Sequence, residues 1–188
     1  MATSARRLSR LQRHLRPPAA IAAATASSES DAAPRVAIVT GSNKGIGFEI
    51  ARALASMPGH HVVACARDAA KGEAAVAQLV AEGVPPHALE FRQLDIDDGA
   101  SIDAFVDWFR EAHPAGLTAL VNNAAIQIEA GVLAPPFAEQ AAPTMHTNVY
   151  QTVALTEALR PCLTDAGRIV CVASMAVRAF DPPAFSSA

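Results

Sequence analysis

The chain has 188 residues, of which 51% are hydrophobic and 18% are charged, and its formal net charge is −3. This length and composition are typical of a single globular domain. The small acidic excess argues against a nucleic-acid-binding role, and no apolar run approaches the roughly 20 residues that a membrane-spanning helix needs. Three scattered cysteines favour buried, reduced thiols over a disulfide framework.

The first 34 residues differ in composition from the rest of the chain. Five arginines occur before residue 17, the first acidic residue is Glu29, and alanine, serine and threonine dominate residues 19–28. An arginine-rich, serine-containing and acid-poor N-terminus is typical of an organelle transit peptide. We therefore expect residues 1–34 to address the protein to a mitochondrion or a plastid. The alternative is a disordered tail without an address on a cytoplasmic protein.

From residue 35 onward, short apolar runs alternate with amphipathic ones. In chain order, the predicted elements are a strand at 35–40, a helix at 46–56, a strand at 61–66, a helix at 69–81, a strand at 89–94, a helix at 101–111, a strand at 117–121, a helix at 143–159 and a strand at 168–172. Strand–helix alternation with short connections is typical of βαβ units. We expect residues 35–188 to form an α/β domain with a doubly wound, Rossmann-type parallel sheet in strand order 3-2-1-4-5.

A glycine-rich loop, T-G-S-N-K-G-I-G at residues 40–47, connects the first predicted strand to the first predicted helix. Glycines at this place let the backbone turn tightly and approach a pyrophosphate, which binds at the positive N-terminus of the helix. The spacing is G-x-x-x-G-x-G rather than the commoner G-x-G-x-x-G. A P-loop is excluded, because Lys44 precedes Gly45 and no Gly-Lys-Ser/Thr follows. The loop therefore predicts a dinucleotide site.

Arg67 directly follows the second predicted strand, where an acidic residue would indicate binding of the ribose hydroxyls of NAD. A guanidinium group instead matches the oxygens of a 2′-phosphate. Asp68 could act as the ribose acid, but we expect it to cap the following helix. Lys44 and Lys71 add positive charge on the same side. The pattern favours NADP(H) over NAD.

Several motifs together resemble those of the short-chain dehydrogenases/reductases: the glycine loop, N-N-A at residues 122–124 and V-A-S at residues 172–174. Within that superfamily the chain is most similar to the NADPH-dependent carbonyl reductases. This closer similarity rests on N-K inside the loop, A-R-D-A-A-K-G at 66–72, Q-L-D-I-D-D at 93–98 and T-M-H-T-N at 144–148. It extends from residue 35 to about residue 180. The resemblance implies reduction of aldehydes, ketones or quinones by hydride transfer from NADPH.

The resemblance also implies a cofactor-binding role for particular residues. Arg67 and Lys71 would hold the 2′-phosphate, Asp95 would accept a hydrogen bond from the adenine amino group, and Asn123 would lie along the cofactor. One departure is Ala125, where the family usually has glycine. The full implied set is Gly41, Ser42, Asn43, Lys44, Gly45, Ile46, Gly47, Arg67, Lys71, Asp95, Ile96 and Asn123.

The catalytic residues that the resemblance implies are Asn148, which would hold a proton-relay water, and Ser174, which would hydrogen-bond the substrate carbonyl. The substrate would also be bordered by Gln140, Ile128, Glu129 and Ala130. No metal site is expected. The expected partner is a small-molecule carbonyl compound, not nucleic acid or a membrane, and the oligomeric state is left open.

The family's general acid is a tyrosine whose pKa is lowered by a lysine four residues later. The one tyrosine here is Tyr150, followed four residues later by Ala154, and the lysines are Lys44 and Lys71. The sequence ends in A-F-S-S-A, 14 residues after Ser174.

From these features we expect a fragment, incomplete at the C-terminal end of the fold and broken just before Tyr-x-x-x-Lys, and inactive by itself. The alternatives are a non-catalytic NADP-binding short form and a fragment of an organellar 3-oxoacyl-carrier-protein reductase.

Overall fold

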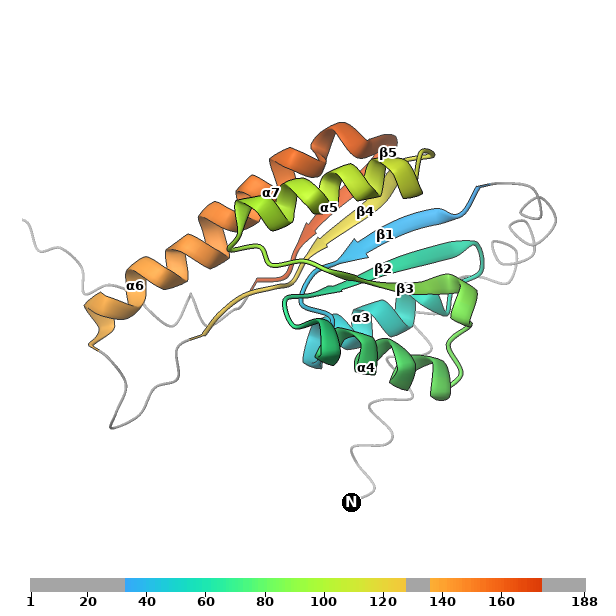
Figure 1. Ribbon diagram of the computed structural model, residues 1–188, viewed down its shortest axis with the longest axis horizontal. Helices are drawn as coiled ribbons and strands as arrows, with labels where there is room; N and C mark the ends of the chain where they lie inside the picture. Colours follow the sequence, from blue (N-terminus) through green and yellow to red (C-terminus); the bar gives the residue numbers. More distant parts are fainter. Residues whose placement is uncertain (1–32, 128–135, 174–188) are drawn as a thin grey trace, which may run out of the picture. The chain divides into compact units, whose positions relative to one another are not determined.

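Five strands form one sheet, in which every neighbouring pair runs parallel. The computed structural model describes residues 33–127 and 136–173 of the chain. The strands lie in the order β3-β2-β1-β4-β5 (Figure 1), which confirms the predicted sheet. Their bounds are β1 Arg35–Val39, β2 His60–Ala66, β3 Leu89–Gln93, β4 Leu117–Asn122 and β5 Leu163–Cys171.

Helices cover both faces of the sheet, with α3 and α4 on one face and α5 and α7 on the other (Figure 1). This is the doubly wound arrangement that the strand–helix alternation predicts. In the described part of the chain, no helix has both the length and the hydropathy that a membrane crossing requires. The helices are α3 Gly45–Ala55, α4 Ala69–Ala81, α5 Gly99–Ala112, α6 Phe137–Met145 and α7 Thr152–Leu159.

The two faces of β1 contribute to two separate cores. Val36 and Ile38 belong to the core under α5 and α7, whereas Ala37 and Val39 belong to the core under α3 and α4. All four side chains are at most 2% exposed. β-Branched residues on both faces suit a central parallel strand, because helices cover such a strand on both sides. β1 is therefore a firmly packed support for the glycine loop that follows it.

The chain order of the strands reverses at β1, since β2 pairs with one edge of β1 and β4 with the other. In open α/β sheets, ligands bind outside the carboxyl ends of the strands at such a switch point. Thr40 follows β1, Arg67 follows β2 and Asn123 follows β4. Residues of three predicted motifs thus meet at one edge of the sheet.

Gly72 lets α4 lie close against β3. A Cβ atom placed on Gly72 would overlap the ring of Phe91, which belongs to β3. The final glycine of A-R-D-A-A-K-G therefore has a packing role. It holds the helix that carries Lys71 near the end of β2.

The long helix predicted at residues 143–159 differs from the structure at its beginning. Helix α6 already begins at Phe137, contains Pro143 and is continued by a π-helical segment, His146–Gln151, before α7. Proline removes one backbone donor from a helix and disturbs its hydrogen-bond ladder. The prediction that a helix starts at Pro143 was therefore wrong. The π-helical segment follows directly after the turn that contains Pro143.

Strand β5 begins at Leu163, five residues earlier than the predicted 168. Its pairing with β4 shifts register, because Leu117 pairs with Leu163 whereas Ala119 pairs with Arg168. The intervening residues, T-D-A-G, are polar or small, so they carry no apolar strand pattern. Only Leu163 of this early part is paired with β4, opposite Leu117, and the polar residues lie in the register shift.

The three free cysteines differ in burial. Cys65 is buried, Cys162 is half-buried and Cys171 is exposed. Burial raises the pKa of the Cys65 thiol far above its usual range. The expectation of buried thiols is right for Cys65 and wrong for Cys171, which lies at the end of the exposed strand β5.

Candidate cofactor site

A cavity of about 600 Å³ lies at the carboxyl ends of the strands, at the switch point. Its wall includes Thr40, Asp97 and Thr147, together with the segment from Asn123 to Ile126. Most of the predicted cofactor-binding residues line it: Gly41, Asn43, Lys44, Gly45, Arg67, Lys71, Asp95, Ile96 and Asn123.

The three glycines of the loop meet two kinds of steric demand. Gly41 and Gly45 have φ angles of 63° and 62°, in the left-handed region that other residues rarely adopt. A Cβ on Gly47 would overlap the side-chain amide of Asn123. Because α3 begins at Gly45, its first backbone N–H groups lie beside the cavity, where they can bind an anion.

Thr40 connects the glycine loop to the segment after β4. Its hydroxyl donates to the Val121 carbonyl at 3.3 Å and accepts from the backbone N–H groups of Asn123 at 3.0 Å and Ala124 at 2.9 Å. The Asn123 side-chain amide donates to the carbonyls of Thr40 at 2.9 Å and Gly41 at 3.1 Å. N-N-A therefore holds the loop in shape. The local sequence pattern around Thr40 did not indicate this arrangement.

Three predicted cofactor contacts do not line the cavity. Ser42 is 3% exposed, and both its hydroxyl and its N–H donate to the Cys65 carbonyl, at 3.1 and 2.9 Å, which ties the loop to β2. Ile46 is 65% exposed on α3. Gly47 is buried beneath the loop, against Asn123. A cofactor contact of these residues stays a prediction.

Positive charge gathers where β2 meets α4. Asp68 caps α4, as predicted, by accepting from the Lys71 N–H at 3.0 Å. This hydrogen bond, together with the Lys71 ammonium 3.0 Å from the carboxylate, lowers the pKa of Asp68. Arg67 is exposed at the strand end, and no residue in 33–127 or 136–173 forms an ion pair with it or with Lys44. Two cations beside the cavity are thus available to an anionic ligand.

The turn after β3 is held by its own acidic side chains. The Asp95 carboxylate accepts from the Asp97 N–H at 3.1 Å, and the Asp95 N–H donates to the Ser101 hydroxyl at 3.0 Å. The Asp97 carboxylate accepts from the Thr147 hydroxyl at 2.8 Å. The turn is therefore joined to the π-helical segment. Ile96, 7% exposed, supplies an apolar part of the cavity wall.

Asn148 lies in the π-helical segment and pairs with the backbone of Ile126. Its side-chain oxygen accepts from the Ile126 N–H at 2.8 Å, and its side-chain amide donates to the Ile126 carbonyl at 2.9 Å. Ile126 lines the cavity, whereas Asn148 does not. The structure thus gives Asn148 an anchoring contact, and its predicted role in proton relay stays a prediction.

The predicted substrate contacts lie away from this cavity or outside the described residues. Gln140 is a half-buried residue of α6 and does not line the cavity. Ser174, Ile128, Glu129 and Ala130 lie outside the described residues.

Asn122, the first residue of N-N-A, is 6% exposed and has a structural contact that the sequence did not reveal. Its amide donates to the Thr156 hydroxyl at 2.9 Å and contacts the Cys171 sulfur at 3.8 Å. Within the described residues its side-chain oxygen is buried without a hydrogen-bond partner. Asn122 therefore links β4 to α7 and β5.

The sequence profile of the short chain dehydrogenase family matches residues 35–186. The chain belongs to this family. It is 45% identical over 148 residues to carbonyl reductase (NADPH) 3 of Homo sapiens, an alignment that covers 78% of this chain and 52% of the human protein. It therefore spans about half the length of the curated relatives it matches.

Solved structures show the same fold. Menthone neomenthol reductase from Mentha piperita aligns with a TM-score of 0.67 and 32% identity over 77% of this chain and 62% of that one. A metagenomic short-chain oxidoreductase in complex with NADP aligns with a TM-score of 0.61 and 33% identity over 75% and 62%. The sequence-based assignment to this superfamily, with its similarity to carbonyl reductases, is confirmed.

Proposed function

We propose that residues 35–188 bind NADP(H) as part of a reductase that transfers a hydride to the carbonyl carbon of an aldehyde, ketone or quinone. The observation that carries the proposal is the cavity at the switch point, where the glycine loop, the start of α3 and Arg67 converge. The names of the carbonyl reductase relatives and the NADP complex of a solved relative support the same cofactor.

The residues present fit a phosphorylated dinucleotide. The backbone N–H groups at the start of α3 suit a pyrophosphate, and Lys44 lies beside them on the same wall. Arg67 presents a planar donor group, not ion-paired with any residue in the described part of the chain, for a 2′-phosphate. The bound cofactor would supply the hydride, while these groups bind and orient its charged parts.

The proton-transfer step of the reaction needs a general acid, and the 188 residues contain no Tyr-x-x-x-Lys pair to supply it. Reduction of a carbonyl leaves negative charge on oxygen, which a general acid must neutralise. Tyr150 is 63% exposed in the π-helical segment, and Ala154 stands four residues later, where the family has lysine. Asn148 and Ser174 are proposed to hold the relay water and the substrate carbonyl. A non-catalytic NADP-binding form is the alternative proposal.

Cofactor preference gives the sharpest test. Titration of the purified chain, followed by nicotinamide fluorescence, should show at least tenfold tighter binding of NADPH than of NADH, which corresponds to about 1.4 kcal/mol. Arg67→Ala should remove most of this preference. Arg110→Ala, which changes an exposed arginine of α5 paired with Asp107, is the matched control and should leave it intact. Equal affinities in the unmutated protein would contradict the proposal.

We also propose that residues 1–34 act as a transit peptide for a mitochondrion or a plastid. The support is their arginine-rich, acid-poor composition. A fusion of these residues to a fluorescent protein tests the proposal by its location in plant and animal cells. A diffuse cytoplasmic signal in both would favour an untargeted tail.

A further inference from the structure

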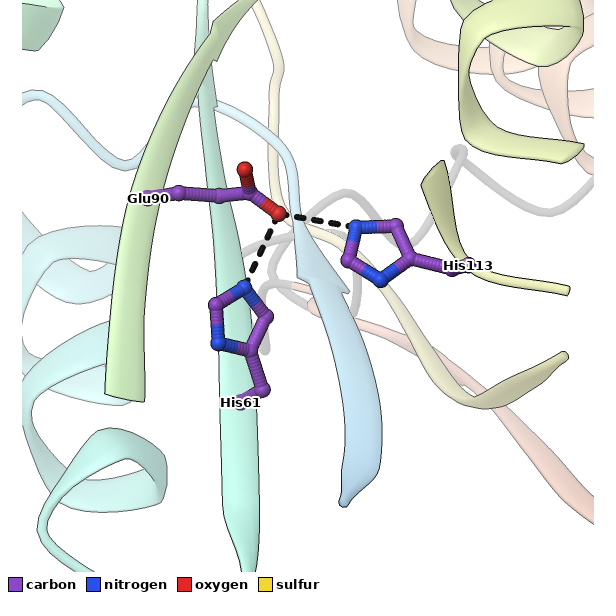
Figure 2. A group of neighbouring side chains, drawn as sticks. All are labelled: His61, Glu90 and His113. Carbon is purple, nitrogen blue, oxygen red and sulfur yellow. Dashed lines mark hydrogen bonds and ion pairs between the residues drawn. The ribbon is translucent and has the colours of Figure 1, made fainter. Parts of the chain in front are cut away.

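Two histidines and a glutamate from three different elements converge on one point (Figure 2). His61 belongs to β2, Glu90 to β3, and His113 is the C-terminal cap residue of α5. The Nε2 atoms of His61 and His113 lie 2.9 and 2.8 Å from the same carboxylate oxygen of Glu90, Oε1. The three ligand-type atoms all lie within 4.8 Å of one another.

This cluster is separate from the cofactor cavity. His61 and Glu90 are each the second residue of their strands, and Glu90 is paired in register with Val63. They therefore lie near the amino-terminal ends of β2 and β3, whereas the cavity lies at the carboxyl ends. None of the three residues lines the cavity, so their arrangement is not explained by dinucleotide binding.

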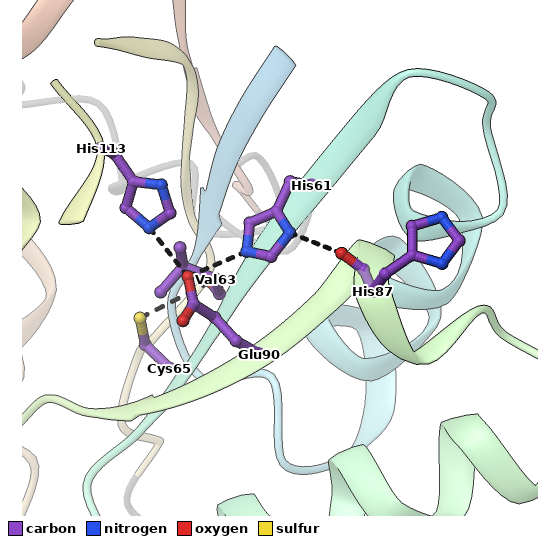
Figure 3. Close-up of polar contacts among 6 residues, drawn as sticks. All are labelled: His61, Val63, Cys65, His87, Glu90 and His113. Atoms are coloured by element: carbon purple, nitrogen blue, oxygen red, sulfur yellow. Dashed lines mark hydrogen bonds and ion pairs between the residues drawn. The ribbon is translucent and has the colours of Figure 1, made fainter. Parts of the chain in front are cut away.

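The tautomer of His61 is set by a backbone carbonyl (Figure 3). Nδ1 of His61 lies 3.0 Å from the carbonyl oxygen of His87. A carbonyl can only accept, so Nδ1 of His61 carries a hydrogen, and in the metal-free cluster Nε2 carries another, which it donates to the Glu90 carboxylate. Loss of the Nε2 hydrogen leaves a neutral ring whose Nε2 lone pair faces Glu90. Histidines that bind metals commonly donate their other ring N–H to a carbonyl in this way.

The surroundings favour a bound cation and leave a path to it. The side chains of His61 and His113 are 19% and 13% exposed, whereas that of Glu90 is 35% exposed and open to solvent. His113 ends α5, and the negative end of a helix attracts positive charge. The rings of Phe109 and Trp108 flank His113, with centroids at 4.9 and 5.6 Å, and they fix its position with apolar contacts.

We propose that His61 Nε2, Glu90 Oε1 and His113 Nε2 bind a zinc ion, with solvent water completing the coordination. Imidazole and carboxylate are common zinc ligands, and bonds of about 2.0–2.2 Å in a tetrahedral site separate ligand atoms by about 3.3 Å. The two nitrogen–oxygen contacts would lengthen by about 0.5 Å to reach that separation. Zinc binds the Nε2 lone pair of each neutral imidazole, so each ring keeps one hydrogen on Nδ1 and any hydrogen displaced from Nε2 passes to solvent. The ion would join β2, β3 and the end of α5 as a structural link.

Zinc affinity tests the proposal directly. The untagged full chain carries Cys171→Ser, because an exposed thiol also attracts zinc. It is stripped with chelator and titrated with Zn²⁺ against a chromophoric indicator. We expect one zinc site, whose affinity His61→Gln, Glu90→Gln or His113→Gln should each lower at least tenfold. The matched controls His60→Gln and His87→Gln remove neighbouring imidazoles but keep the His87 carbonyl, and they should bind as tightly as the parent.

A second measurement needs no substitution in the cluster, so it stays decisive if a variant folds poorly. In the Cys171→Ser chain, Zn²⁺ should shift the imidazole NMR signals of His61 and His113, leave those of His60 and His87 unchanged, and raise the melting temperature. Absence of binding at 100 micromolar Zn²⁺, or shifts confined to other histidines, would show that the cluster is a hydrogen-bonded ion pair and no metal site. NADPH affinity is measured in parallel, and its loss or retention does not bear on this outcome.

Discussion

A single hydroxyl group, Oγ1 of Thr40, takes part in three of the hydrogen bonds that hold the glycine loop against the segment after β4. Thr40 is 2% exposed, so water cannot replace these bonds. The partners lie 81 to 84 positions away in the sequence. The sequence could place the loop from its glycines, but local pattern carries no information about such distant partners. For the same reason it could not reveal the backbone contacts of Ser42 and Asn148.

Replacing Thr40 by valine should destabilise the fold by about 1–3 kcal/mol, because two partly buried N–H donors, of Asn123 and Ala124, would lose their acceptor. Urea unfolding at neutral pH measures the loss. Thr40→Ser keeps the hydroxyl and should recover most of it. Thr144→Val, which removes only a bond to the Gln140 carbonyl within α6, is the matched control and should cost less. A Thr40→Val protein as stable as the parent would mean that the loop does not depend on this hydroxyl.

At the level of helices and strands, local periodicity was sufficient to predict the bounds of elements that have a regular apolar face. Helix α4 has the predicted bounds, 69–81, and β3 and β4 differ from prediction by one residue each. The failures lie at α6 and β5. Helix α6 begins before Pro143, so this proline does not mark a helix start, and β5 begins at Leu163, which pairs with Leu117 ahead of a register shift.

The contact between α4 and β3 gives a prediction at this scale. Gly72→Ala should destabilise the protein by about 1–3 kcal/mol, because the added methyl group overlaps the Phe91 ring and forces the helix away from the sheet. Gly99→Ala at the start of α5 meets no atom within 4 Å and is the matched control. Thermal unfolding of both variants decides the matter, and equal melting temperatures would contradict the packing role.

For the whole molecule, the fold class and the cofactor end of the sheet were predictable, because the glycine loop, Arg67 and N-N-A are ordered motifs at strand ends. The histidine–glutamate cluster was not, and no metal site was expected. His61 and Glu90 are 29 residues apart, and Glu90 and His113 are 23 apart, a spacing that matches no compact metal motif. Only the folding of β2, β3 and α5 brings them together.

The proposed carbonyl reduction needs a general acid, and the sequence shown has no Tyr-x-x-x-Lys. A missing general acid lowers rates by roughly 10²–10⁴-fold. We therefore expect this chain to bind NADPH without measurable turnover on a panel of aldehydes, ketones, quinones and 3-oxoacyl thioesters. A chimera in which residues 1–173 are followed by the C-terminal half of human carbonyl reductase 3 should gain turnover. Turnover by the unextended chain that depends on Ser174 would show that another residue donates the proton.

The hydrogen bonds that Asn123 donates to Thr40 and Gly41 of the glycine loop have a consequence for the kinetics of cofactor association. They come from the protein itself, so the loop has its φ angles and its exposed N–H groups before any ligand arrives. Little conformational entropy then remains to be lost on binding, and a preorganised site gains affinity by avoiding that cost. NADPH should associate in one concentration-dependent phase, with no slower step of loop ordering after the encounter.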